Sequence, residues 1–344
     1  MIKINSINIH VPKTPSDQVF DSNDLDLINS KNIQLKSKNF YNIINNKNLK
    51  EIKCNWESSL LKKNYTNYTN SYFLLEIESE KDKYKGIICG ISTDILKRKL
   101  VFPHENVSSI RVEKLKNYLK TVKIQAEPVV IATRYTKDII IAINLASKNK
   151  PILSFDYKKI KYMIKKINIK NSINNFSSFF IVDGHHRLKS LNELSDQLKS
   201  DFQLLTLLTE ISSVKSNNFI WKVYNPSSRL IKRLIQLNRS NSKPNLNSFW
   251  ANFKNKYYVF DKSNLKTMSI NYFEKWITSN GDIISHINPR AQTPIIHNSN
   301  TIIFNYPPIS FNKIVKSNKN KLLPKKTTYL EPKIVTGLII SSLK

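Results

Sequence analysis

The side chains best suited to chemistry are gathered in one short run, residues 183–187, which reads Asp-Gly-His-His-Arg. Four of these five side chains can exchange protons, bind a metal ion or contact phosphate oxygens. Histidine is scarce in this chain, with six in 344 residues, and two of the six are adjacent here. This concentration sets the run apart from an ordinary Asp-Gly surface turn, and we interpret it as a functional site.

The flanking residues predict the elements that position this run. Residues 179–182 are aromatic or β-branched, which is typical of a buried strand. The spacing of Leu188, Leu191, Leu194 and Leu198 predicts one apolar face of a helix. A strand that turns on glycine into a helix points backbone N–H groups and the positive end of the helix dipole at whatever lies in front, most often a phosphate.

Each residue of the run has an expected part in such a turn. Asp183 stands where an N-cap residue would stand, and Gly184 permits a positive φ and a close approach of a ligand to the backbone. Arg187 falls in the first helical turn, where its fork suits phosphate oxygens.

A second constellation, His104-Glu105, follows a short apolar segment and precedes a predicted helix that carries Arg111. A His-Glu pair at the end of a strand is able to hold a metal ion or to take a proton from an attacking hydroxyl group. The same residues also suit an ordinary surface helix start, with Asn106 as the cap and Glu105 beside the helix dipole. Both interpretations stay open at this point.

The remaining elements alternate irregularly. Residues 73–78 and 84–92 read as a hairpin, whereas residues 107–123, 157–167 and 227–238 read as helices. Strands and helices are mixed without regular βαβ alternation, which favours an α+β fold over a doubly wound sheet. We expect three parts: a polar N-terminal segment (1–70) that packs on the core, a core domain with the Asp-Gly-His-His-Arg turn (71–243), and a C-terminal α+β lobe that completes the site (244–344).

The formal net charge of +30 invites a nucleic-acid interpretation. Lysine supplies 47 of the 55 basic residues, and Lys, Asn and Ile, all abundant here, are all encoded by A/T-rich codons. The base composition of the genome would therefore raise the charge without any role in binding, and nucleic acid is not the favoured partner. By the same logic, each of the eight arginines is more informative than a lysine.

Composition also limits the cellular setting. No stretch approaches the roughly 20 apolar residues of a membrane span, and the N-terminus lacks an apolar core of signal-peptide length. The two cysteines, Cys54 and Cys89, make neither a disulfide framework nor a thiolate metal site. A reducing, cytoplasmic setting without a membrane partner fits best.

Three motifs together resemble the family called domain of unknown function 1015. They are the His-Glu segment, the Asp-Gly-His-His-Arg segment, and a terminal Pro-Lys-Lys-Thr-Thr-Tyr segment (324–329) followed by Pro332-Lys333 and Gly337-Leu338. The resemblance spans roughly residues 70 to 343. The chain departs from the family pattern near Pro15, where a Pro-Pro-Tyr-Asp stretch is missing, at Val107, which replaces Thr, and at Ser228, which replaces His.

A more distant likeness suggests the chemistry. The strand–turn–helix is similar to the nucleotide-binding turn of the ParB and sulfiredoxin fold, whose superfamily includes free-serine kinases with a similar Asp-Gly-His-X-Arg turn that holds nucleotide phosphate. The likeness implies a mixed-sheet core with peripheral helices and a C-terminal lobe. It also implies Mg²⁺ and ATP or ADP as cofactors, and it is an analogy of fold, not proof of function.

The first hypothesis is therefore phosphoryl transfer from a nucleotide to a small hydroxylated metabolite. Phosphate is expected at Gly184, His185, His186 and Arg187, with further positive charge from Arg111 and Lys326. Catalysis is assigned to Glu105 as base, with His104 and Asp183, and the metal ion to Asp183 and Glu105.

Two alternatives stay open. One is a nucleotide-gated nucleic-acid-binding protein of ParB type, for which residues 227–238 supply the only basic amphipathic helix in view. The other is a metal-dependent hydrolase that uses the His104-Glu105 pair with the central turn. No His-Glu-X-X-His spacing supports the hydrolase.

Overall fold

The computed structural model describes residues 2–30, 35–97, 100–103, 107–170, 176–245, 247–260, 277, 283–287, 300–317 and 328–343. These residues divide into two compact units. Unit 1 comprises Met1–Val214 and Leu330–Lys344, and unit 2 comprises Lys215–Tyr329. The boundaries expected from the sequence, near residues 70 and 243, differ from these. The division into the three expected parts stays a prediction.

Unit 1 is built on a nine-stranded mixed sheet in the order β4-β9-β6-β10-β3-β2-β8-β7, with β1 paired to β2. The pairs β10–β6 and β4–β9 are parallel and the others are antiparallel. The strands are β1 (Ile7–Pro12), β2 (Tyr65–Glu78), β3 (Lys83–Ser92), β4 (Val101–Phe102), β6 (Val129–Thr133), β7 (Leu153–Tyr157), β8 (Ile160–Ile167), β9 (Phe179–Asp183) and β10 (Gln203–Glu210). The α+β class with a large mixed sheet is confirmed.

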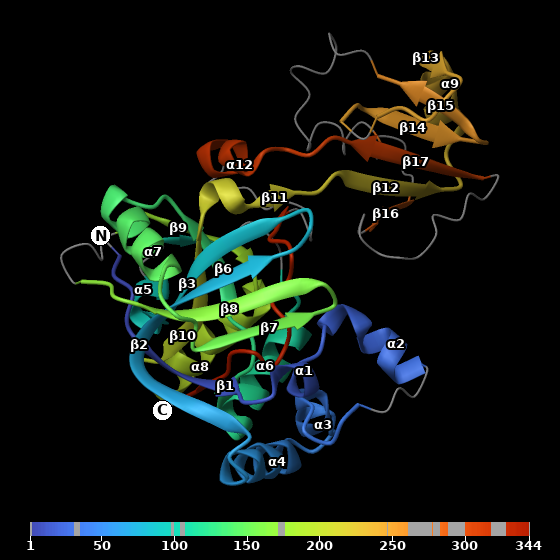
Figure 1. The fold of residues 1–344 in the computed structure, drawn as a ribbon. Coiled ribbons are helices and arrows are strands. Elements are labelled where there is room, and N and C mark those ends of the chain that lie inside the picture. The colour runs from blue at the N-terminus through green and yellow to red at the C-terminus, as the bar shows by residue number, and fades with distance from the viewer. Residues whose placement is uncertain are drawn as a thin grey trace. The chain divides into compact units, whose positions relative to one another are not determined.

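Helices surround this sheet, as Figure 1 shows. They are α1 (Pro15–Gln18), α2 (Leu25–Ser30), α3 (Phe40–Ile44), α4 (Leu49–Leu61), α5 (Thr93–Lys97), α6 (Ser109–Val122), α7 (Lys137–Ser147) and α8 (His185–Leu198). Two short strands, β5 (Ile124–Gln125) and β19 (Ser341–Ser342), pair beside the main sheet. None of the described helices is long and apolar enough to cross a membrane.

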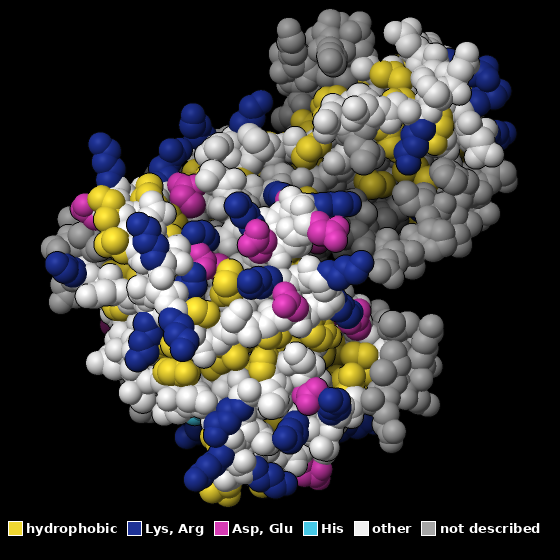
Figure 2. Space-filling model, in the orientation of Figure 1, with side chains coloured by type: hydrophobic (Ala, Val, Ile, Leu, Met, Phe, Trp, Pro, Cys, Tyr) yellow, Lys and Arg dark blue, Asp and Glu magenta, His cyan; other side chains and the backbone are white. Residues whose placement is uncertain are grey.

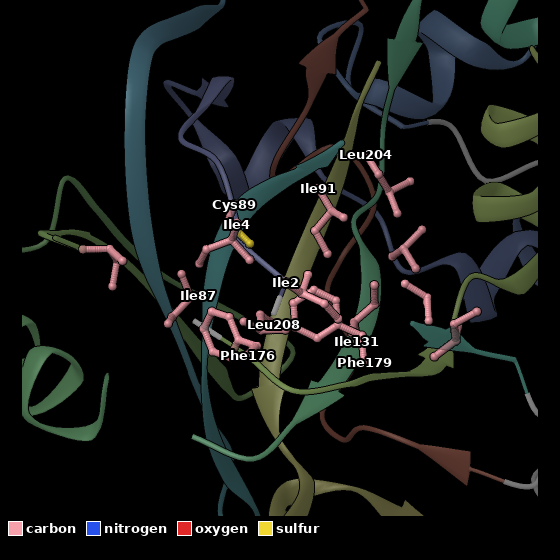
Figure 3. Packing of buried hydrophobic residues seen from close by; sticks show 14 of the residues in the cluster. Ile2, Ile4, Ile87, Cys89, Ile91, Ile131, Phe176, Phe179, Leu204 and Leu208 are labelled. Carbon is pink, nitrogen blue, oxygen red and sulfur yellow. The ribbon is translucent and has the colours of Figure 1, made fainter. Parts of the chain in front are cut away.

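One face of the sheet and three helices share the main core. Alternate residues of β3, such as Ile87, Cys89 and Ile91, lie in one buried cluster with residues of α6, α7 and α8. Figure 3 shows this packing around Ile131 and Phe179. Burial raises the pKa of the Cys89 thiol, which therefore stays protonated and is not a nucleophile.

The sequence predicted several of these elements. The hairpin, the helix near residues 107–123, and the strand–turn–helix at 179–198 are confirmed as β2–β3, α6 and β9–α8. The helix predicted at residues 157–167 is wrong, because most of this segment forms β8, which pairs with β2 on one side and β7 on the other. Leu198, expected on the buried stripe of α8, is 44% exposed at the end of the helix.

A buried ion cluster joins the sheet to the C-terminal end of α7. The carboxylate of Glu76 lies 2.6 Å from Nζ of Lys165 and 2.9 Å from Nζ of Lys85, and it accepts a hydrogen bond from the hydroxyl of Ser147. Glu76 and Lys165 are each 6% exposed. Burial opposes ionisation of Glu76, but the two ammonium groups and the Ser147 hydroxyl outweigh it and hold the pKa of this carboxyl below its ordinary value of 4.5.

Glu76→Gln is expected to lower the free energy of unfolding by about 3 kcal/mol, because it leaves a buried ammonium group without its counter-ion. The group with a lowered pKa stabilises the fold above pH 4.5 and loses that effect as the pH falls through its folded-state pKa. Urea unfolding at neutral pH should therefore give a large difference in the free energy of unfolding between wild type and variant. Below pH 4 this difference should be smaller. Glu78→Gln, at the exposed end of the same strand, is the matched control and should change little.

Unit 2 contains a second sheet, in the order β13-β15-β14-β17-β12-β16. The strands are β12 (Phe219–Tyr224), β13 (Asn238–Ser240), β14 (Trp250–Phe253), β15 (Lys256–Val259), β16 (Ile283–Ile287) and β17 (Thr301–Tyr306). Two helices, α9 (Ser228–Ile235) and α12 (Phe311–Ser317), and the pair β11 (Lys215–Ser216) and β18 (Thr328–Tyr329) complete the described part. The sequence also predicts a helix near residues 272–278, of which only Ile277 lies within the described residues.

Candidate functional site

The Asp-Gly-His-His-Arg run forms the turn between β9 and α8. Gly184 is the N-cap of α8 and has a φ of +93°, in the left-handed region that favours glycine. The expectation that Asp183 caps the helix is wrong, because Asp183 ends β9 and the N-cap position is taken by Gly184, which has no side chain. The first turn of α8, residues 185–187, therefore follows an N-cap residue that brings no capping side chain.

Space around Gly184 is tight. A Cβ atom at this position would lie 3.0 Å from Nε of Arg187 and 3.0 Å from Cγ2 of Val129. The backbone carbonyl of Gly184 accepts the first hydrogen bond of α8, from the N–H of Leu188 at 3.0 Å. Glycine is thus required here both by backbone conformation and by the close approach of the Arg187 side chain.

Arg187 bridges two carboxylates. Its Nη1 lies 2.7 Å from Oε2 of Glu127, and its Nη2 lies 2.7 Å from Oδ2 of Asp183. The Arg187 side chain is 25% exposed, whereas that of Asp183 is 47% exposed. Such a bridge fixes the orientation of Asp183 beside the helix N-terminus. The direct contact between Arg187 and phosphate that the sequence suggests stays a prediction.

The C-terminal segment reaches the same network. The hydroxyl of Thr336 donates a hydrogen bond to Oε1 of Glu127, whose other oxygen holds Arg187. Thr336 also exchanges backbone hydrogen bonds with Phe20. Three segments that are distant in the sequence therefore meet next to the β9–α8 turn. One lies near each end of the chain and one precedes β6.

Sequence reasoning missed Glu127. It immediately precedes Pro128, and nothing in its local pattern marks it as a partner of Arg187. Thr336 lies between the Pro332-Lys333 and Gly337-Leu338 pairs of the terminal motif and was not singled out. The signal that could have pointed to Glu127 is Arg187 itself, because an arginine that is half-buried in the fold needs a carboxylate partner. Thr336 would then follow as a hydrogen-bond donor to that carboxylate.

The two histidines of the turn differ in environment. His185 is 6% exposed, so its imidazole lies inside the fold. His186 is half-buried, and its Nε2 accepts a hydrogen bond from the backbone N–H of Ser108 at 3.0 Å. A ring nitrogen that accepts carries no proton, so the neutral ring holds its proton on Nδ1.

This bond brings the start of α6 to the turn. Ser108 is the N-cap residue of α6, and β4 runs parallel to β9 with Phe102 stacked on Phe180 at 5.5 Å between ring centroids. Described residues on either side of the His104-Glu105 segment therefore contact β9 and α8. His104 and Glu105 themselves lie outside the described residues, as does Lys326.

Arg111 lies in the first turn of α6, three residues beyond Ser108. Its side chain is exposed, and in the described part of the chain it makes no hydrogen bond or ion pair. It is therefore available as a positive charge near the start of α6, although no described contact joins it to the β9–α8 turn.

The described residues contain no group of three or more His, Cys, Asp or Glu that could hold a metal ion. A magnesium ion needs fewer protein ligands, because it is commonly bound by one or two carboxylates together with substrate phosphates. Asp183 offers one half-exposed carboxylate at the turn and fits that requirement. The metal-dependent hydrolase would need several protein ligands at once, and two of those proposed for it, His104 and Glu105, lie outside the described residues.

A surface pocket of about 340 Å³ lies elsewhere in unit 1. It runs along the outer side of α7 and is lined by Ile141, Leu145 and Lys170, among others. It shares no lining residue with the β9–α8 turn, and it holds no constellation suited to catalysis. The candidate site is therefore the turn and not this pocket.

Comparison with known proteins gives one family and several distant structures. The family model described as "Protein of unknown function (DUF1015)" matches residues 23–268. No curated protein matches the chain.

Among solved structures, SbnI with C-terminal truncation from Staphylococcus aureus is 14% identical with a TM-score of 0.41, over 72% of this chain and 85% of that one. A free serine kinase in complex with AMP is 13% identical with a TM-score of 0.34, over 73% of this chain and 92% of that one. A conserved hypothetical protein from Pyrococcus furiosus is 12% identical with a TM-score of 0.34, over 73% of this chain and 95% of that one. Similarity this distant says nothing about chemistry, so function has to be argued from the residues of the turn.

Proposed function

This chain belongs to the DUF1015 family, and we propose that it transfers a phosphoryl group from ATP or ADP to the hydroxyl group of a small metabolite. The observation that carries the proposal is the β9–α8 turn, where Gly184, in the left-handed region, is the N-cap residue of α8. A helix start of this kind is suited to bind phosphate, because its N–H groups and its dipole favour negative charge. The finer fold assignment, to the ParB and sulfiredoxin type, is part of the same proposal.

The turn supplies binding and orientation. Phosphate oxygens would accept hydrogen bonds from the backbone N–H groups of the first turn of α8, next to His186 and Arg187. Arg187 would act mainly as a positioning residue, because its guanidinium is held by Glu127 and Asp183. Asp183 would hold a magnesium ion, which when bound neutralises phosphate charge.

Besides positioning and neutralisation of charge, the reaction needs a base for the acceptor hydroxyl group. The acceptor oxygen attacks the terminal phosphorus of the nucleotide, a new O–P bond forms, and the bond to the leaving phosphate oxygen breaks. The acceptor proton passes to a carboxylate, which we assign to Glu105, with His104 beside it. Arg111 remains a proposed source of positive charge, whereas Lys326 belongs to unit 2 and its part stays a prediction.

A phosphorus NMR time course tests this function. The full chain, magnesium and ATP, and then ADP, are mixed with a pool of serine, homoserine, threonine and small hydroxy acids. A new phosphomonoester resonance that depends on the chain is expected, and splitting the pool identifies the acceptor. If neither nucleotide is consumed with any acceptor class, phosphoryl transfer is excluded for these substrates.

Glu105→Gln is expected to keep nucleotide affinity within about threefold and to lower turnover by about 10²–10⁴, the range that general base catalysis contributes. Calorimetry measures the first quantity and the NMR time course measures the second. Glu113→Gln removes an exposed carboxylate from nearby α6 and is the matched control. Full turnover in the Glu105 variant would show that Glu105 is not the base.

A further inference from the structure

The charge of the chain is divided unevenly between its two units. Unit 2, residues 215–329, holds 19 of the 55 basic residues but only 3 of the 25 acidic ones. Unit 2 therefore carries +16 in a third of the chain, and unit 1 carries the remaining +14 of the total of +30. The described residues of unit 2 contain no Asp or Glu.

Genome base composition does not explain this division. Codon bias that favours lysine acts on both units alike, and A/T-rich codons also encode Asp and Glu. Unit 1 holds the other 22 acidic residues, so the chain is able to use them freely. The depletion of carboxylates in unit 2 is thus a property of that unit, and a charge asymmetry of this kind indicates a polyanionic partner.

Basic side chains of unit 2 gather at one edge of its sheet. α9 carries Arg229 and Lys232, both exposed, and leads directly into the edge strand β13 with exposed Arg239. β13 pairs with β15, and the turn between β14 and β15 presents exposed Lys254 and Lys256. Three of the eight arginines of the chain, at positions 229, 233 and 239, fall within this short stretch.

The five exposed cations of this edge are not neutralised by neighbours within the described residues. The ion pairs between described side chains include none of the five. On the face of the molecule that Figure 2 shows, Lys and Arg appear on the described part of unit 2 without Asp or Glu among them. Such a surface attracts anions from a distance, and salt weakens that attraction.

The partner is better described as nucleic acid than as a lipid surface. A basic helix that lies on a membrane must bury its apolar face in the lipid. In α9 that face is already used, because Leu230 and Leu234 are both 0% exposed inside unit 2. Only Ile235 remains as an exposed large apolar residue of the helix.

An exposed aromatic side chain that precedes α9 in the chain fits a nucleic acid as well. Tyr224 ends β12 just before α9 and is 40% exposed. Nζ of Lys222 lies 4.9 Å from the centre of its ring. Exposed aromatic rings beside cations stack with unpaired bases in proteins that bind single strands.

We propose that unit 2 binds the phosphate backbone of nucleic acid through the basic edge, defined as Arg229, Lys232, Arg239, Lys254 and Lys256. Recognition is by charge, without reading of base sequence, which is the usual basis of non-specific binding. This binding is independent of phosphoryl transfer in unit 1, and either function can fail alone.

Fluorescence anisotropy with the full chain tests the proposal. The probes are a short duplex DNA, a single-stranded DNA of the same length and the corresponding RNA, each at several salt concentrations. One variant combines Arg229→Gln, Lys232→Gln, Arg239→Gln and Lys254→Gln. The matched control removes the same charge from exposed lysines of unit 1 through Lys13→Gln, Lys47→Gln, Lys50→Gln and Lys62→Gln. Circular dichroism establishes that both variants are folded.

The unit 2 variant is expected to bind at least about tenfold more weakly at low salt. The slope of log affinity against log salt should fall by about 0.9 for each duplex phosphate that the variant no longer neutralises. The control should keep nearly the wild-type affinity. Tighter binding of the single strands than of the duplex would support a stacking role for Tyr224. Equal reductions in both variants, or no binding to any probe, overturn the proposal. Binding to phosphatidylserine vesicles without binding to nucleic acid overturns it in favour of a membrane.

Discussion

Arg187→Ala is expected to weaken nucleotide binding by about 30-fold, which corresponds to about 2 kcal/mol. In the native chain the guanidinium bridges Glu127 and Asp183 at 2.7 Å on each side. Without it, two carboxylates face each other beside the start of α8. Their unbalanced charge repels a nucleotide phosphate, and no guanidinium orients Asp183. We expect only a moderate loss of affinity, because these side chains are partly exposed and water therefore partly screens their charges.

Two further variants separate charge from geometry. Arg187→Lys keeps the positive charge but not the planar fork that reaches both carboxylates, so an intermediate affinity is expected. Glu127→Gln removes one carboxylate and leaves Arg187 paired with Asp183 alone, which adds positive charge at the turn. Its affinity should therefore fall much less than that of Arg187→Ala.

Calorimetric titration with ATP and with ADP measures these affinities, and thermal unfolding without nucleotide shows how much stability each variant loses. Wild-type affinity in a folded Arg187→Ala variant would mean that nucleotide binds elsewhere, or that the Arg187 bridge has only a structural part.

The sequence was sufficient to predict the turn because its signals are local. The apolar strand, the glycine and the apolar helix face occupy consecutive residues, and each predicts its element without help from the rest of the chain. The hairpin of β2 and β3 is predictable for the same reason, since a short charged turn joins two apolar runs.

β8 shows where local patterns fail. Its apolar residues at 160, 163, 164 and 167 suit a helix face, yet Tyr162 and Ile164 also alternate with Lys161 and Lys165 as in a strand. Pairing with β2 and β7 decides between the two periods, and such long-range partners are invisible in a short window of sequence.

The same limit applies to the site. Glu127 lies 60 residues from Arg187 along the chain, and Thr336 lies 209 residues from Glu127. Which carboxylate would meet Arg187 depends on how β6 and the C-terminal segment are placed by the whole fold. The types of residue in the turn were therefore predictable, whereas the direction of the Arg187 side chain was not.

Gly184→Ala is expected to lower both the stability of the fold and the affinity for nucleotide. A φ of +93° costs a residue with a Cβ about 1–2 kcal/mol. The new Cβ would also lie 3.0 Å from Nε of Arg187, so the guanidinium must shift. Because the same turn would bind phosphate, we expect affinity to fall by at least about tenfold.

Gly86→Ala is the control for lowered stability. A Cβ at Gly86 would lie 2.4 Å from Cδ1 of Leu207 and 3.0 Å from the backbone oxygen of Leu208, where β3 packs against β10. This variant should unfold at a lower temperature than wild type and bind nucleotide normally as long as it is folded. Gly184→Asn is the second comparison, because Asn adopts the left-handed region more readily than Ala but keeps the Cβ.

Thermal unfolding and calorimetry on the three variants then separate two effects. If strain alone mattered, affinity would follow stability, with Gly184→Asn recovering both. If the close approach at the turn matters, Gly184→Asn recovers stability but not affinity, and Gly86→Ala loses stability but not affinity. We expect the second pattern, because a Cβ at position 184 is disfavoured by the backbone conformation and also lies close to Arg187. Normal affinity in both Gly184 variants would show that the turn does not bind phosphate.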